Sequence, residues 1–226
     1  MLQDAVFNLQ SVLSLPLQLD SSNTQALEKA MRMYNGKAMI NSVNGKQSSM
    51  SEVFPLVQKY GGVVVCLCLD ESGIPETAQG RIDIAKKIIK TAESYGIDKK
   101  DLVVDALVMT ISTNKDNAKE TLKAVDYIRH EFGVGTVLGV SNISFGLPKR
   151  EAINTAFFTL ALKAGLSAGI INPLSESMMN AYYSYNALEG FDDNCTEYIE
   201  SVTASANTAT AAGVTDLKMA IIKGTK

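Results

Sequence analysis

Six short apolar runs, each ending in an aspartate or an asparagine, are the feature that most constrains how this chain folds. Stretches with helical periodicity separate the runs, and a regular alternation of strand and helix is typical of a parallel sheet. The runs cover residues 17–20, 38–41, 63–70, 102–105, 136–142 and 168–172, and they end at Asp20, Asn41, Asp70, Asp105, Asn142 and Asn172. Because the carboxyl ends of parallel strands point the same way, we expect these side chains to meet on one face.

Aspartate and asparagine also cap helices and tolerate unusual backbone angles in loops, so each of these residues taken alone has a structural explanation. All six runs end in one of the two residue types, which favours a shared site. Such a ring offers acceptors and amide donors but almost no fixed positive charge. It therefore suits a flat polar heterocycle better than a phosphate or a nucleic acid.

The composition is that of an ordinary soluble domain. The 226 residues are 46% hydrophobic and carry a formal charge of -3, so the chain can bury a sizeable core. No basic stripe with interleaved aromatics is present, and we expect no nucleic-acid partner. No run reaches the ~18 apolar residues needed to cross a bilayer, so we expect no membrane partner either.

The three cysteines and the single histidine do not form a metal motif. An odd cysteine count argues against a disulfide framework and favours a reducing, cytoplasmic location. Cys66 and Cys68 lie on one face of a predicted strand with no further ligand nearby in sequence, and Cys195 is distant. We expect no metal in this chain, two buried thiols, and a solvated His130 near a helix C-terminus.

Three helical segments, residues 77–95, 114–132 and 151–164, show apolar stripes of the kind that covers a sheet. A closed (β/α) barrel is favoured over an open sheet because the candidate site residues come from every strand, and because no G-x-G-x-x-G follows the first strand. Six strands are two fewer than the usual eight. The predicted fold is a (β/α)8 TIM-type barrel that lacks its first two strand-helix units.

The C-terminal part of the chain differs in composition from the rest. Residues 200–213 are rich in Ser, Thr and Ala, which favours a connector, and residues 215–224 begin an amphipathic helix. The predicted domains are a barrel over residues 1–199, incomplete at its N-terminus, and a linker with the start of a second, helical region over residues 200–226.

Five short motifs carry a resemblance to a known family: LPLQLDSS at 15–22, MINSVNG at 39–45, LDESGIP at 69–75, GVSNISFG at 139–146 and INP at 171–173. They resemble the pterin-binding domain of cobalamin-dependent methionine synthase and the related methyltetrahydrofolate:corrinoid methyltransferases. The resemblance runs from near residue 1 to about residue 190. The last helical segment resembles the start of the cobalamin-binding region that follows this barrel.

The resemblance implies a (β/α)8 barrel similar to dihydropteroate synthase. It also implies transfer of the N5 methyl group of the substrate 5-methyltetrahydrofolate to cob(I)alamin held on a corrinoid domain or protein, as in methionine biosynthesis. Within a methionine synthase, a homocysteine-binding domain would be a further partner.

The family's contacts carry over to matching positions of this chain. Asp20, Asn41 and Asp105 match pterin-contacting positions, and Asn142 matches the asparagine that approaches N5. The Asn142 carbonyl oxygen would accept from a protonated N5, with Asp20 tuning the delivery of the proton.

Other polar residues have two explanations each. Ser144, Asp70 and Asn172 are further candidates for pterin contact, although Asp70 fits an ordinary turn equally well, and Asn172 before Pro173 fits a structural role better. Arg81 could meet the anionic folate tail or form a surface ion pair, and the ion pair is favoured.

Two alternative functions remain open. A dihydropteroate synthase would share the fold but needs a Lys and Arg pair for a diphosphate. Lys149 and Arg150 are near the last strands, yet the loop 141–146 fits the methyltransferases better. The second alternative is a truncated, non-catalytic pterin-binding fragment, with possible self-association through the sheet edges that the missing strands would expose.

Overall fold

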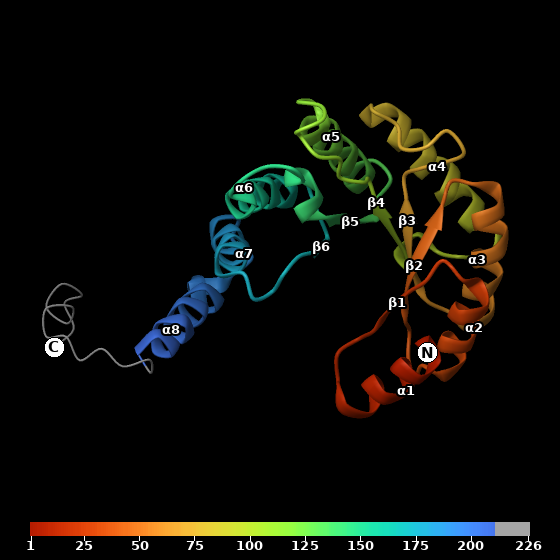
Figure 1. Ribbon diagram of the computed structural model, residues 1–226, viewed down its shortest axis with the longest axis horizontal. Helices are drawn as coiled ribbons and strands as arrows, with labels where there is room; N and C mark the ends of the chain where they lie inside the picture. The colour runs from red at the N-terminus through yellow and green to blue at the C-terminus, as the bar shows by residue number, and fades with distance from the viewer. Residues whose placement is uncertain (211–226) are drawn as a thin grey trace, which may run out of the picture. The chain divides into compact units, whose positions relative to one another are not determined.

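The computed structural model describes residues 1–210 and separates into two compact units, residues 1–171 and 172–226. The first unit holds one sheet of six parallel strands, in which each strand pairs with its neighbours in sequence (Figure 1). The strands are β1 Gln18–Asp20, β2 Met39–Asn44, β3 Val63–Leu67, β4 Leu102–Asp105, β5 Gly135–Gly139 and β6 Ala168–Ile170. The predicted strands are therefore all present.

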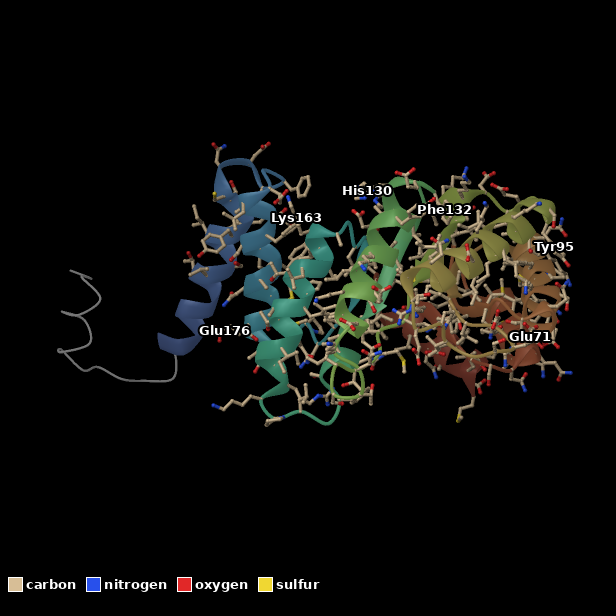
Figure 2. All side chains as sticks on the ribbon, turned by 90° about the horizontal axis from the view of Figure 1, so that it is seen from above. Glu71, Tyr95, His130, Phe132, Lys163 and Glu176 are labelled. Atoms are coloured by element: carbon tan, nitrogen blue, oxygen red, sulfur yellow. The ribbon has the colours of Figure 1, made fainter. Side chains whose placement is uncertain are left out.

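A helix follows each of the first five strands and returns the chain to the start of the next. The helices of this unit are α1 Leu2–Val12, α2 Thr24–Met33, α3 Gln47–Tyr60, α4 Ala78–Ser94, α5 Asn117–His130 and α6 Arg150–Lys163. Helices α2 to α5 lie along the outer side of the curled sheet (Figure 1). Figure 2 shows Tyr95, His130 and Phe132, at or just after the ends of α4 and α5, along one edge of the first unit. The strands are antiparallel to these helices, so the carboxyl ends of the strands lie at the opposite edge.

The central strands are buried on both faces. In β3, Val64, Val65 and Cys66 are all at most 1% exposed, as expected for a parallel sheet covered by helices. The predicted apolar stripe of α4 is confirmed, since Ile82, Ala85, Ile88, Ile89 and Ala92 are all buried. Gly96 ends this helix with φ +75°, a conformation that favours glycine over residues with a side chain.

Helices α5 and α6 bury only part of the apolar stripes that their periodicity predicts. In α5 the predicted Val125 and Ile128 are buried, whereas Ala118 and Leu122, predicted on the same stripe, are only half-buried. Asn117, Thr121 and Ala124 complete the buried face. Thr121 is tolerated on the buried face because its hydroxyl accepts from Arg81 and donates to the Asn117 carbonyl. In α6 the predicted Phe157 is buried together with Phe158 and Ala161, whereas Leu160, predicted on the same stripe, is exposed.

The sheet has two open edges. Strand β1 pairs only with β2, and β6 pairs only with β5. All three residues of β6 are exposed, and in β1 only Leu19 is buried. A curled sheet of six parallel strands with alternating helices is a (β/α)8 barrel without two of its strand-helix units, which confirms the predicted fold class.

The second unit is described as far as residue 210. It contains α7 Glu176–Leu188 and α8 Thr196–Thr210. The Asp192 carboxylate caps α8 by accepting from the backbone N–H groups of Glu197 and Tyr198, each at 3.0 Å. Residues 200–210 of the predicted connector continue α8 as a helix. The predicted helical start at 215–224 lies outside the described residues. Across residues 1–210, no helix is long and apolar enough to span a membrane.

Candidate functional site

The carboxyl end of β1 places Asp20 beside Asn41 of β2. The two residues are register partners, and the Asn41 amide Nδ2 donates to Asp20 Oδ2 over 3.2 Å. Strand β2 continues past Asn41 to Asn44, so Asn41 lies within the strand. Both side chains line a cavity of about 360 Å³ that reaches the start of α3. The remaining polar lining consists of Ser21, Ser22, Thr24, Ser42, Asn44, Lys46, Ser48, Ser49 and Glu52.

Asp105 is the last residue of β4 and is level with Leu67 in β3. It is only 8% exposed, and its Oδ1 accepts the backbone N–H of Leu107 at 2.8 Å. Burial raises the pKa of Asp105 to about 6, against the opposing effects of the Leu107 hydrogen bond and the Arg81 charge. Oδ2 makes no hydrogen bond within the described residues. Asp105 is thus an ionised acceptor at neutral pH with unused capacity.

The short helix η2, Val140–Ser144, follows β5 and carries Asn142 and Ser144. Asn142 is half-buried, and its amide packs against Gly139, where an added Cβ would lie 3.1 Å from Nδ2. Ser144 is fully buried, and its hydroxyl donates to Asn154 Oδ1 at 2.7 Å and accepts from Arg150 Nε at 3.0 Å. These contacts orient Ser144 toward α6, where it supports η2.

Asp70 and Asn172 both use their side chains in local turns. Asp70 Oδ1 accepts the Ser72 N–H at 2.8 Å, and the Asp70 and Gly73 backbones pair with each other. Asn172 Oδ1 accepts the Leu174 N–H at 3.0 Å. Asn172 also begins the second compact unit, whereas the other five strand-end residues belong to the first.

The prediction of a surface ion pair for Arg81 is wrong. Its side chain is fully buried, and the guanidinium hydrogen-bonds to the carbonyls of Pro75 and Leu107 and to the Thr121 hydroxyl. Arg81 lies four residues before Ala85 and seven before Ile88, so helical periodicity places it on the buried face of α4 and only its polarity favoured the surface. Burial lowers the pKa of this guanidinium, although arginine stays charged.

Sequence reasoning also missed Leu107 and Gly139. Leu107 has φ +61°, a left-handed conformation with no signature in a leucine. Gly139 lies in the GVSNISFG motif, and its close approach to Asn142 could have been suspected from a glycine that ends a strand.

The cysteines and the histidine lie as predicted. Cys66 and Cys68 are buried, and desolvation raises the pKa of the Cys66 thiol to about 12. His130 is exposed in the last turn of α5 (Figure 2). Among residues 1–210, no group of three or more His, Cys, Asp or Glu side chains could hold a metal ion.

The fold and the polar strand ends place this chain among the (β/α) barrel proteins, which carry their sites at the carboxyl ends of the strands. The sequence pattern of the family described as pterin binding enzyme matches residues 2–172, and the chain belongs to this family. This confirms the family resemblance of the five sequence motifs.

The most similar curated proteins include methyltransferases. The chain is 28% identical over 193 residues to a methylcorrinoid:tetrahydrofolate methyltransferase of Eubacterium limosum, an alignment that covers 84% of this chain and 71% of the relative. It is 33% identical over 180 residues to methionine synthase of Mycobacterium tuberculosis, which covers 74% of this chain but only 15% of that protein.

Solved structures of the same fold include dihydropteroate synthases. A dihydropteroate synthase of Yersinia pestis superposes with a TM-score of 0.66 at 17% identity, over 83% of this chain and 78% of the other. This likeness supports the barrel fold alone. The Lys and Arg pair considered for a diphosphate is not a free pair, because Arg150 donates to Ser144 and to the Ser141 carbonyl and stacks 4.6 Å from the Phe145 ring centroid.

Proposed function

We propose that this chain is a folate-dependent methyltransferase domain that binds 5-methyltetrahydrofolate and transfers its N5 methyl group to cob(I)alamin on a corrinoid domain or protein. The observation that carries this proposal is a buried Asp105 at the same end of the sheet as the hydrogen-bonded pair Asp20 and Asn41, in a chain similar to folate methyltransferases.

The polar edge of a pterin fits these groups. It presents an amino group and a ring N–H side by side, followed by a carbonyl and ring nitrogens. A carboxylate accepts two such donors, and an amide meets a mixed donor and acceptor pair. We assign the donors to Asp105, whose Oδ2 is unused in the described residues, and the mixed pair to Asn41. Asp20 would hold the Asn41 amide in orientation through the 3.2 Å hydrogen bond.

Asn142 would act at N5. A tertiary amine is a poor leaving group, so positive charge must be present on N5 as the methyl group leaves. The Asn142 amide does not titrate, but its carbonyl oxygen can accept from a protonated N5 and stabilise that charge. Gly139 gives this amide its space, and Arg150 and Asn154 hold the η2 helix through Ser144.

The corrinoid on the partner would supply the metal centre that exchanges the methyl group with the folate. The name of the Eubacterium limosum relative gives the reaction with methylcorrinoid as the donor, the reverse of the direction proposed here. Both directions pass through the same transition state, so the residues proposed above serve either. A homocysteine-binding domain would be a third partner in a methionine synthase context.

Two measurements test the proposal. Isothermal titration of the 226-residue chain with 5-methyltetrahydrofolate measures binding, and single-turnover absorbance spectroscopy with free cob(I)alamin measures methyl transfer. Binding together with transfer supports the methyltransferase, and binding without transfer supports the non-catalytic alternative. Absence of binding by a folded chain contradicts the proposed function.

A further inference from the structure

The side chain of Arg81 connects three elements next to Asp105. It leaves α4 and is fully buried. Its Nε donates to the Pro75 carbonyl at 3.0 Å, and its Nη1 donates to the Leu107 carbonyl at 3.0 Å and to Thr121 Oγ1 at 2.6 Å. The guanidinium therefore ties together the loop before α4, the segment after β4 and the buried face of α5.

Leu107 is the link between Arg81 and Asp105. Its φ of +61° is a backbone conformation that residues with a side chain avoid. Both of its backbone polar groups are engaged: the N–H donates to Asp105 Oδ1 at 2.8 Å, and the carbonyl accepts from Arg81. Strain of this kind persists only where surrounding contacts over-determine it, and it concentrates at functional sites.

The third guanidinium nitrogen indicates that Arg81 does more than hydrogen-bond to buried polar groups of the core. Nη2 is buried and has no hydrogen-bond partner among residues 1–210. A buried charge that is not fully hydrogen-bonded is costly to the fold. An apolar side chain at this position would avoid that cost, so stability alone does not account for an arginine here.

We propose that Arg81 is a positioning residue for Asp105. It holds Leu107 in the left-handed conformation, so that the Leu107 N–H occupies Oδ1 and Oδ2 stays free to receive a donor from the pterin. This inference rests on the proposed pterin contact of Asp105. Arg81 itself is buried behind Leu107 and acts through it.

The charge of Arg81 gives it a second effect on the same carboxyl. The titratable groups that act on Asp105 are Arg81 and the buried thiol of Cys68, and the charge of Glu120 acts on Arg81. Burial holds the pKa of Cys68 well above its usual range, so this thiol is neutral. Arg81 is therefore the charge that lowers the pKa of Asp105 against the effect of burial.

The test is isothermal titration of the 226-residue chain with 5-methyltetrahydrofolate between pH 5 and pH 8. In Arg81→Met we expect the pH of half-maximal affinity to rise by about one unit and the affinity at pH 8 to fall about tenfold. Arg81→Lys keeps the charge but cannot span the acceptors, so its midpoint should stay and its affinity at pH 8 should fall. Arg32→Met, which removes an exposed arginine at the end of α2, is the matched control and should titrate like the parent.

Two results would overturn the inference. One is an Arg81→Lys variant with parental affinity at pH 8, which decides the question even if Arg81→Met does not fold. The other is an Arg81→Met variant that is less stable but has an unchanged midpoint, which is the behaviour of a purely structural residue. In an Asp105→Asn background, Arg81→Met should add no further pH dependence.

A carboxyl NMR titration of Asp105 without ligand separates this inference from the proposed function. A higher Asp105 pKa in Arg81→Met, in a chain that binds no pterin, would support the coupling and contradict the function. An unchanged Asp105 pKa in a chain that binds pterin normally would contradict the coupling and support the function.

Discussion

The carboxyl of Asp105 is nearly removed from water, and its proton equilibrium is therefore coupled to folding. Its pKa rises from 3.8 to about 6 in the folded chain because burial disfavours the charged form. Between these values the folded state binds more protons than the unfolded state. The stability contributed by this group is therefore present below pH 4 and is lost as the pH rises through about 6.

Asp105→Asn removes this dependence while keeping the shape of the side chain. We expect the variant to gain stability relative to the parent as the pH rises from 4 to 7, by on the order of 3 kcal/mol in the free energy of unfolding. Urea unfolding of both proteins at each pH measures the difference, in which all other titrating groups cancel. A difference that is flat with pH would mean that Asp105 is hydrated in solution.

The same carboxylate should make pterin binding fail at low pH. Protonation removes one acceptor, so the affinity for 5-methyltetrahydrofolate should fall as the pH drops below about 6. Asp105→Ala should weaken binding at pH 7.5 by roughly 1 to 3 kcal/mol, because the pterin donors are then buried without an acceptor. Calorimetric titration checks both. Equal affinity of parent and variant would assign Asp105 a purely structural role.

Asn142 is expected to matter for the transition state more than for binding. Asn142→Ala removes an acceptor whose interaction strengthens as N5 carries charge, and loss of one such contact costs on the order of 3 kcal/mol in the barrier. Single-turnover methyl transfer should therefore slow about a hundredfold, while the dissociation constant of the folate changes little. Ser141→Ala, at the exposed preceding position of η2, is the control. An unchanged rate in Asn142→Ala would show that Asn142 takes no part in methyl transfer.

At the scale of elements, the end of β5 sets the position of Asn142. A Cβ on Gly139 would lie 3.1 Å from Asn142 Nδ2, so Gly139→Ala should displace the amide by a few tenths of an ångström. Displacement of a positioned group lowers the rate steeply, and we expect roughly a tenfold loss of methyl transfer with little change in stability. Gly135→Ala in the same strand meets only ordinary contacts, at 3.6 Å or more, and should behave like the parent. Equal rates for the two variants would contradict this role of Gly139.

The elements themselves could be predicted because hydrophobic periodicity is local. All six strands and the helices between them follow from apolar runs and stripes, and β4 coincides with its predicted bounds. The faces that the helices bury were harder to predict from the sequence. Thr121 faces the core because Arg81, which is remote in sequence, donates to it. A single sequence predicts that such polar residues are exposed, because it does not show that they are hydrogen-bonded to each other in the core.

The candidate site could be predicted in part for the same reason. Asp20, Asn41 and Asp105 were located as the last residues of the predicted strands, although β2 continues past Asn41. Parallel pairing brings Asp20 and Asn41 into contact. The sequence did not reveal that Ser144 supports η2 from within or that Asp70 and Asn172 bond to their own turns. These outcomes depend on side-chain orientation, which spacing along the chain does not specify.

At the scale of the whole molecule, the open edges of the sheet are the dominant feature. Backbone N–H and C=O groups on the outer side of β1 and β6 have no strand partner within the described residues. An exposed strand edge is a template for pairing with another chain. The first unit also exposes apolar side chains at Ile170 in β6 and at Phe7 and Val12 in α1. The isolated 226-residue chain is therefore expected to self-associate or to unfold with poor cooperativity.

Sedimentation velocity over a range of concentrations, together with thermal unfolding, tests this expectation. Ile170→Lys places a charge on the β6 edge, which disfavours edge pairing, and should shift the chain toward the monomer. Ile74→Lys alters an exposed apolar residue in the turn before α4, away from both edges, and should leave the association unchanged. Equal responses to the two substitutions would mean that association does not use the β6 edge. A parent chain that stays monomeric and melts in one sharp transition would mean that the edges are protected by the rest of the polypeptide, and would remove the reason to expect self-association.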